Sequence, residues 1–155
     1  MRALITCIFI LAATALALGV QRPQPNPVEK WQPSELIRPQ DLIIKIRDNG
    51  PTKPMIVFVG FMASYRAGHI PGAVFAGPAS SAAGLETIKS AMAKVPKNRD
   101  IVVYCACCPW EACPNVRPAF ELLHQLGYNQ VKALMIPSNL EVDWMNKGYP
   151  FEKGQ

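Results

Sequence analysis

Three short apolar runs constrain the fold of this chain more than any other feature of its sequence. They lie at residues 55–59, 101–104 and 131–136, and almost every side chain in them is apolar. Runs of this length that are apolar on both faces are typical of strands buried in a parallel sheet. Stretches with apolar side chains at helical spacing separate them, namely Leu85, Ile88, Met92 and Val95, then Val116, Phe120, Leu123 and Leu126. This alternation predicts an α/β fold in which helices cover both faces of a parallel β-sheet.

Two further helices are predicted at the ends of this α/β region. The first covers residues 39–46, and its buried face is expected to consist of Leu42, Ile43 and Ile46. The second opens with Ser138 and Glu141, a pair with the spacing of a capping box, and stops at Gly148. Its buried face is expected to consist of Leu140 and Trp144.

Residues 1–19 have the composition of a secretory signal peptide. Arg2 precedes an uncharged apolar stretch at residues 4–18, and the small residues Ala17 and Gly19 form a cleavage site. The apolar stretch is shorter than the roughly 20 residues of a membrane-spanning helix. We therefore expect an exported protein, periplasmic or secreted, with no stable membrane span after the signal is cleaved.

Residues 20–33 contain four prolines and no apolar periodicity, so they are predicted to form an extended, Pro-rich tether. Residues 34–155 are expected to form one domain, because the mature chain is long enough for only one hydrophobic core. The formal net charge of +5 comes from scattered rather than clustered basic residues. A nucleic-acid interface is therefore not expected, although a mildly basic surface attracts small anions.

A cysteine-rich loop is predicted between the strand at 101–104 and the helix that starts at Val116. It holds four of the five cysteines of the chain, namely Cys105, Cys107, Cys108 and Cys113. A loop that leads into a helix presents backbone N–H groups and the positive end of the helix dipole. A thiol in such a place can have its pKa lowered enough to be a nucleophile at neutral pH. Because parallel sheets bind ligands at the carboxyl ends of their strands, this loop is the candidate active site.

The segment from Tyr65 to Ala73, Tyr-Arg-Ala-Gly-His-Ile-Pro-Gly-Ala, carries a resemblance to a known family. It closely resembles the Tyr-x-x-Gly-His-Ile-Pro-Gly-Ala segment of the rhodanese family. Further landmarks follow in the family's order, namely Tyr104-Cys105, Leu126-Gly127-Tyr128, Trp144 and Gly148-Tyr149-Pro150. The resemblance covers roughly residues 35–152 and implies a rhodanese-like domain. We expect His69 to be a structural residue of the turn, since a thiolate activated by backbone donors needs no general base.

The resemblance implies a sulfurtransferase that needs no cofactor. A cysteine thiolate would take sulfane sulfur from thiosulfate or a similar small anionic donor, and a thiol or other thiophilic acceptor would then remove it from the persulfide. Cys105 is ranked first as the nucleophile, because the family places its nucleophile directly after the strand. Cys108 is ranked second, because its distance from the following helix suits the family's spacing better.

The loop differs from the family pattern, which is Cys-x-x-x-x-Arg. Trp110 stands where that arginine would follow Cys105, and the first arginine beyond it is Arg117. We expect both side chains to contribute to binding of the sulfur donor. Arg117 would supply charge, and Trp110 would act as a lid or shape the loop.

Three other functions are open at this level. An exported thiol–disulfide redox or sensor protein would use Cys107 and Cys113 as resolving or disulfide partners. A metal-binding protein would hold Zn²⁺ or Cu(I) between the four thiolates, but their spacing is not that of paired Cys-x-x-Cys knuckles, and no metal ligands are assigned. A rhodanese-like domain without activity would act as a binding module.

Overall fold

The computed structural model describes residues 30–48, 50 and 53–154. The predicted signal peptide lies outside the described residues, and so does the predicted tether except for residues 30–33. Within the described part of the chain, no helix is long and apolar enough to cross a membrane. Cleavage of a signal peptide and a periplasmic or secreted location remain predictions.

Parallel strands form one sheet in the order β1-β5-β4-β2-β3. The strands are β1 (Leu36–Ile37), β2 (Met55–Phe58), β3 (Val74–Phe75), β4 (Ile101–Tyr104) and β5 (Val131–Leu134). The three predicted strands are β5, β4 and β2, which occupy the centre of the sheet. The predicted α/β fold with a parallel sheet is thereby confirmed. The edge strands β1 and β3 have two residues each and are too short to show any periodicity in the sequence.

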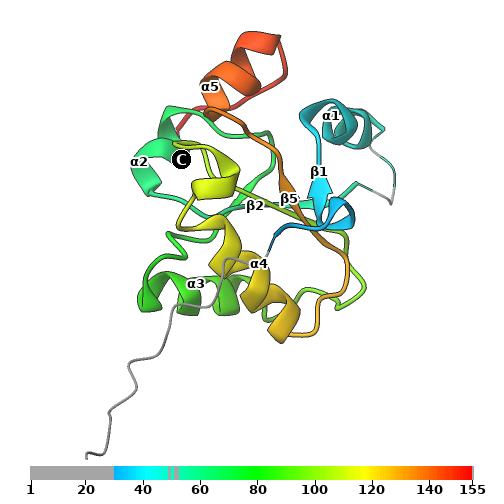
Figure 1. The fold of residues 1–155 in the computed structure, drawn as a ribbon, viewed down its shortest axis with the longest axis vertical. Coiled ribbons are helices and arrows are strands. Elements are labelled where there is room, and N and C mark those ends of the chain that lie inside the picture. Colours follow the sequence, from blue (N-terminus) through cyan, green and yellow to red (C-terminus); the bar gives the residue numbers. More distant parts are fainter. Residues whose placement is uncertain (1–29, 49, 51–52, 155) are drawn as a thin grey trace, which may run out of the picture. The chain divides into compact units, whose positions relative to one another are not determined.

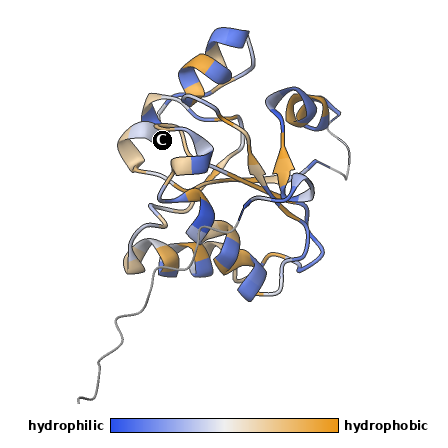
Figure 2. Ribbon diagram, viewed as in Figure 1, coloured by the Kyte–Doolittle hydropathy of each residue, from blue (hydrophilic) through white to orange (hydrophobic). Residues whose placement is uncertain are grey.

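Helices cover both faces of this sheet, as predicted. They are α1 (Pro39–Arg47), α2 (Met62–Ala67), α3 (Ala82–Met92), α4 (Val116–Gln125) and α5 (Leu140–Asp143), with short 3-10 helices η1 (Pro33–Glu35), η2 (Trp110–Ala112) and η3 (Met145–Lys147). Helices α3 and α4 lie on one face, and α1 and α5 lie on the other (Figure 1). Figure 2 shows that α3 and α4 carry both apolar and polar residues, as expected of helices with one buried side.

Two apolar cores form because successive side chains of a strand point to opposite faces of the sheet. Val57 and Val103 pack with α3 and α4, whereas Ile56 and Val102 pack with α1 and α5. Both faces of the central strands are therefore buried, which explains why their sequences are continuously apolar instead of alternating between apolar and polar residues. The predicted buried faces of the first and last helices are confirmed, because the following residues are buried: Leu42, Ile43, Ile46, Leu140 and Trp144.

The predicted capping box of Ser138 and Glu141 is wrong, because α5 begins one residue later than expected. Asn139 is its N-cap, and the carboxamide oxygen of Asn139 accepts a hydrogen bond of 3.0 Å from the N–H of Val142. The carboxylate of Asp143 accepts a second bond, of 2.6 Å, from the N–H of Ser138. The N-terminal donors are thus satisfied by Asn139 and Asp143.

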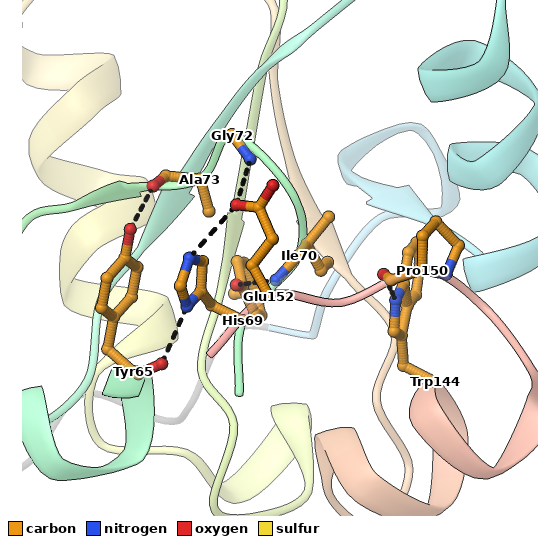
Figure 3. A network of polar contacts seen from close by, with 9 residues as sticks. Tyr65, His69, Ile70, Gly72, Ala73, Trp144, Pro150 and Glu152 are labelled. Carbon is orange, nitrogen blue, oxygen red and sulfur yellow. Dashed lines mark hydrogen bonds and ion pairs between the residues drawn. The ribbon is translucent and has the colours of Figure 1, made fainter. Parts of the chain in front are cut away.

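The predicted stop of this segment is confirmed. Gly148 follows η3 in the left-handed region, with φ of 75°, which suits a residue without a Cβ atom. The chain then turns back toward Trp144, whose Nε1 donates a hydrogen bond of 2.7 Å to the carbonyl of Pro150 (Figure 3). One buried indole therefore ties the last helix to the C-terminal segment.

Gly84 in α3 lies against a neighbouring stretch of backbone. A Cβ atom at this position would lie 1.9 Å from the carbonyl oxygen of Pro78. We expect Gly84→Ala to lower the free energy of unfolding by about 1–3 kcal/mol, because the helix or the turn must move. Denaturant unfolding followed by circular dichroism measures this change. A stabilised variant, as expected from helix propensity at an open position, would contradict the close approach.

Candidate active site

The cysteine-rich loop lies where the sequence predicts it, between the end of β4 and the start of α4. Because β4 is the central strand of the sheet, the loop leaves from the middle of its carboxyl edge. The 3-10 helix η2 divides the loop into two arms. The first arm carries Cys105, Cys107 and Cys108, and the second arm carries Cys113.

Two backbone hydrogen bonds, one from the first arm and one from η2, fix the loop to the neighbouring segments. The N–H of Leu140 in α5 donates to the carbonyl of Ala106 at 3.0 Å, and the N–H of Trp110 donates to the carbonyl of Ile136 at 2.9 Å. Both partners lie in the chain that follows β5. The loop is therefore held at the edge of the sheet where α/β folds bind their ligands.

The sulfurs of the loop gather at one point. The Sγ of Cys107 lies 3.5 Å from that of Cys105 and 3.4 Å from that of Cys108, and all three lie within 4.8 Å of one another. Cys113 approaches this group from the second arm, and its sulfur interacts with those of Cys105 and Cys108. Cys107 is exposed, Cys108 is partly buried, and Cys105 and Cys113 are buried. All four are free thiols in the structure, so the role of Cys107 and Cys113 as resolving or disulfide partners stays a prediction.

Cys113 is the cysteine whose ionised form the fold favours. The hydrogen bond from the Cys105 thiol, the N–H of Asn115, the Cys108 thiol and the N–H of Val116 lower the pKa of Cys113 to about 5, although burial opposes ionisation. The two N–H groups belong to the N-terminus of α4, where the helix dipole also favours an anion. The fold therefore favours the thiolate form of Cys113 over its thiol form.

Cys105 and Cys108, the two cysteines ranked as nucleophiles from the sequence, have raised instead of lowered pKa values. The hydrogen bond to Cys113, together with burial, raises the pKa of Cys105 above its usual range. Burial, followed by the hydrogen bond to Cys113, raises the pKa of Cys108 to about 12. Both are thiols at neutral pH and act as donors to the thiolate. The cysteine at the end of the strand, Cys105, is thus not the cysteine that ionises most easily, which is Cys113.

The lowered pKa of Cys113 predicts how its alkylation depends on pH. The rate with iodoacetamide should rise as pH increases through about 5 and then level off, because the thiolate is the reacting form. The rates for Cys105 and Cys108 should still be rising well above neutral pH. Peptide mass spectrometry of the reduced chain separates the three sites. A Cys113 rate that follows an ordinary thiol, with a midpoint near about 8.5, would contradict the lowered pKa.

Asn115 is a site residue that the sequence reasoning missed. It is only 1% exposed, and its carboxamide oxygen accepts a hydrogen bond of 2.9 Å from the N–H of Ser80. Its Nδ2 donates to the Sγ of Cys105 at 4.0 Å. An asparagine directly before the helical pattern was a visible N-cap signal. The structure makes no such side-chain cap and uses the carboxamide to join the turn before α3 to the sulfur group.

Trp110 and Arg117, predicted to bind the sulfur donor, meet on the ring of Trp31. The ring centroids of Trp110 and Trp31 lie 5.5 Å apart, and the Arg117 guanidinium lies 4.1 Å from the Trp31 centroid. Arg117 also lies 3.9 Å from Glu121, and its buried Nη2 atom has no hydrogen-bond partner among the described residues. Trp31 belongs to the predicted tether, so the end of that segment packs on the domain. A direct role of Trp110 or Arg117 in donor binding stays a prediction.

The turn around His69 is fixed by a polar network (Figure 3). The buried His69 ring has its Nδ1 2.9 Å from the carbonyl oxygen of Tyr65 and its Nε2 3.6 Å from the carboxylate of Glu152. The N–H of Ile70 donates to the hydroxyl of Tyr104 at 2.9 Å, which connects the turn to the last residue of β4. These contacts agree with a structural role for His69 in the turn.

A cavity of about 560 Å³ opens beside the exposed side of the loop. Ala106 and Cys107 line it from the loop, Leu140 lines it from α5, and Lys153 lines it from the C-terminal segment. Lys153 and Glu141 both line the cavity, so the ammonium group that favours an anion there lies in the same cavity as one carboxylate. A molecule that reaches the sulfurs through this cavity meets Cys107 first.

Comparisons with known proteins bear on the whole domain. A model of the rhodanese-like domain matches residues 35–135. The BH2092 protein from Bacillus halodurans is similar in structure, with a TM-score of 0.61 and 25% identity over 77% of each chain. The Alr3790 protein from Anabaena sp. has a TM-score of 0.59 and 25% identity over 76% of this chain and 91% of its own. A thiosulfate sulfurtransferase from Pseudomonas aeruginosa shares the fold with a TM-score of 0.58 and 19% identity, over 79% of this chain and 21% of its own. No match was found among curated proteins.

Proposed function

The chain belongs to the rhodanese-like domain family, and we propose that it is a sulfurtransferase that carries sulfane sulfur as a persulfide on Cys113. The placement of Cys113 carries this proposal, because its buried sulfur lies at the N-terminus of α4, where the neighbouring thiols and the N–H groups of Asn115 and Val116 lower its pKa. Sulfur transfer needs a thiolate at neutral pH, which an ordinary thiol supplies only in small part.

The reaction follows from the chemistry of this thiolate. The Cys113 sulfur attacks the outer sulfur of a donor such as thiosulfate, the sulfur–sulfur bond of the donor breaks, and sulfite leaves with the electron pair. Cys113 then carries the persulfide. The thiolate of an acceptor attacks the outer sulfur of that persulfide, and Cys113 leaves as a thiolate again. The donors that stabilise Cys113 before the attack stabilise it once more as the leaving group.

The charge at the entrance supports a small anionic donor. Lys153 and Glu141 are the charged residues that line the cavity beside Cys107, and the chain as a whole has a formal net charge of +5. One protein of the same fold is a thiosulfate sulfurtransferase, so thiosulfate is the donor to test first. A thiol or another thiophilic molecule that enters the same cavity would be the acceptor.

A thiol–disulfide function is the second candidate, because the Cys107 sulfur lies 3.5 Å and 3.4 Å from two neighbouring sulfurs. Oxidation would join two of these thiols in a disulfide, while the S–S bond of an external disulfide breaks and its two sulfurs take up the two electrons and two protons as thiols. A redox protein of this kind would lose two free thiols on mild oxidation and would release no sulfite from thiosulfate.

Sulfite release from thiosulfate in the presence of a thiol acceptor tests the proposed function. The reduced full chain should release sulfite in many turnovers. A variant with serine at all four loop cysteines should release none. Cys7→Ser is the matched control, since Cys7 lies outside the described residues and far along the sequence from the loop. Absence of sulfite release from the folded wild-type chain would contradict the proposal.

A further inference from the structure

We propose that Cys105, Cys107 and Cys108 form a binding site for one soft cation, Cu(I), which is separate from the sulfur-carrying role of Cys113. The inference goes beyond the proposed function and does not depend on it. It is carried by the arrangement of three sulfur atoms in the first arm of the loop.

The distances between the sulfurs fit one metal ion. A thiolate sulfur lies about 2.3 Å from a bound first-row ion, so three sulfurs around one ion in a plane lie about 4.0 Å apart. Cys107 lies 3.5 Å and 3.4 Å from its two neighbours, and the remaining pair lies within 4.8 Å. Shifts of a few tenths of an ångström would make the three distances equal, which side-chain torsions can supply.

The chemistry of the group favours Cu(I). Its members are all cysteines, and no histidine or carboxylate joins them among the described residues. Soft thiolate ligands select Cu(I) and Zn²⁺, but a structural Zn²⁺ site is completed by a fourth ligand. Cys113 lies outside the group of three sulfurs and is already engaged by the N–H groups of α4. Cu(I) binds stably with three sulfur ligands, so Cys105, Cys107 and Cys108 already form a complete set of ligands for this ion.

The site is also accessible and held in place before an ion arrives. Cys107 is exposed and lines the cavity of about 560 Å³, whereas Cys105 is buried at the inner end of the group. An ion can therefore enter beside Cys107 and reach all three sulfurs. The hydrogen bond of 3.0 Å between Leu140 and Ala106 fixes the backbone between the first two ligands. An entry path and a preformed frame are what a bound ion requires of a protein.

Titration with Cu(I) in competition with a chromophoric chelator tests this site. The full chain is used in reduced form without oxygen, with Cys7→Ser in every sample so that only loop cysteines can respond. We expect one Cu(I) per chain. Cys107→Ser and Cys108→Ser should each weaken binding by at least about 100-fold, since even loss of an outer-shell partner costs 10–100-fold. Cys113→Ser is the matched control and should weaken binding by less than about tenfold.

Three results would overturn the proposal. The first is a Cys107→Ser variant that binds Cu(I) as tightly as the parent. The second is an equal loss of Cu(I) affinity in Cys113→Ser and Cys107→Ser. The third is displacement of Cu(I) by an equal concentration of Zn²⁺. A second readout uses the same samples, because bound Cu(I) should protect Cys107 and Cys108 from alkylation in peptide maps. No sulfur donor is present, so these results stand whether or not the chain transfers sulfur.

Discussion

Replacing Trp144 with alanine should lower the free energy of unfolding by about 3–5 kcal/mol, the range of large aromatic truncations in cores. Trp144 is fully buried, and its ring lies 5.0 Å from that of Tyr149 between centroids. Its Nε1 donates to the carbonyl of Pro150, so the variant also leaves that acceptor without its partner. Denaturant unfolding at fixed pH measures the loss.

Phe151 provides a control in the same segment. Its side chain is 42% exposed, so Phe151→Ala should change the free energy of unfolding much less, by about 0.5–1 kcal/mol. Equal losses in the two variants would show that the C-terminal segment is sensitive to any truncation. An unchanged melting temperature of Trp144→Ala would contradict the core position of the indole.

Replacing Cys113 with serine should lower the rate of sulfur transfer by at least about a thousandfold, as loss of a catalytic nucleophile does. Serine has nearly the same size, so the fold should be retained, and the hydroxyl does not ionise near neutral pH. The rate of sulfite release per folded chain measures this effect, with circular dichroism as the check on folding.

Cys105→Ser separates the two assignments of the nucleophile. Its hydroxyl can still donate a hydrogen bond to Cys113, so a measurable part of the activity should remain. If the cysteine at the strand end is the nucleophile instead, activity should be lost in Cys105→Ser and kept in Cys113→Ser. Cys108→Ser tests the assignment favoured by the spacing to the helix in the same way: if Cys108 is the nucleophile, this variant should lose activity and Cys113→Ser should keep it.

Most of the fold could be predicted because its central strands are buried on both faces. Only continuously apolar runs satisfy that environment, and β2, β4 and β5 show them plainly. The segment around His69 predicted the family, which the family model confirms. The edge strands could not be predicted, since two residues contain no period. The cap of α5 was misplaced by one residue because Ser138 and Asn139 are both good N-cap residues, and only the folded chain decides between them.

The position of the site could be predicted from the sequence, but the pKa values of its cysteines could not. The position of the loop follows from the strand and the helix that flank it. The preference of Cys113 for the thiolate depends on which backbone N–H groups and thiols reach its sulfur, and the sequence does not encode those distances in any local pattern. Packing of Trp31 was hidden for a related reason, because a single tryptophan in a proline-rich segment has no periodicity to reveal a buried face.

The central claim is that the cysteine-rich loop carries sulfane sulfur on Cys113. A mass spectrum of the reduced full chain after incubation with thiosulfate tests it most directly. We expect a gain of one sulfur atom per chain, which a reductant removes and which peptide mapping assigns to Cys113. A chain of unchanged mass, or a sulfur atom mapped to Cys105 or Cys108, would contradict it.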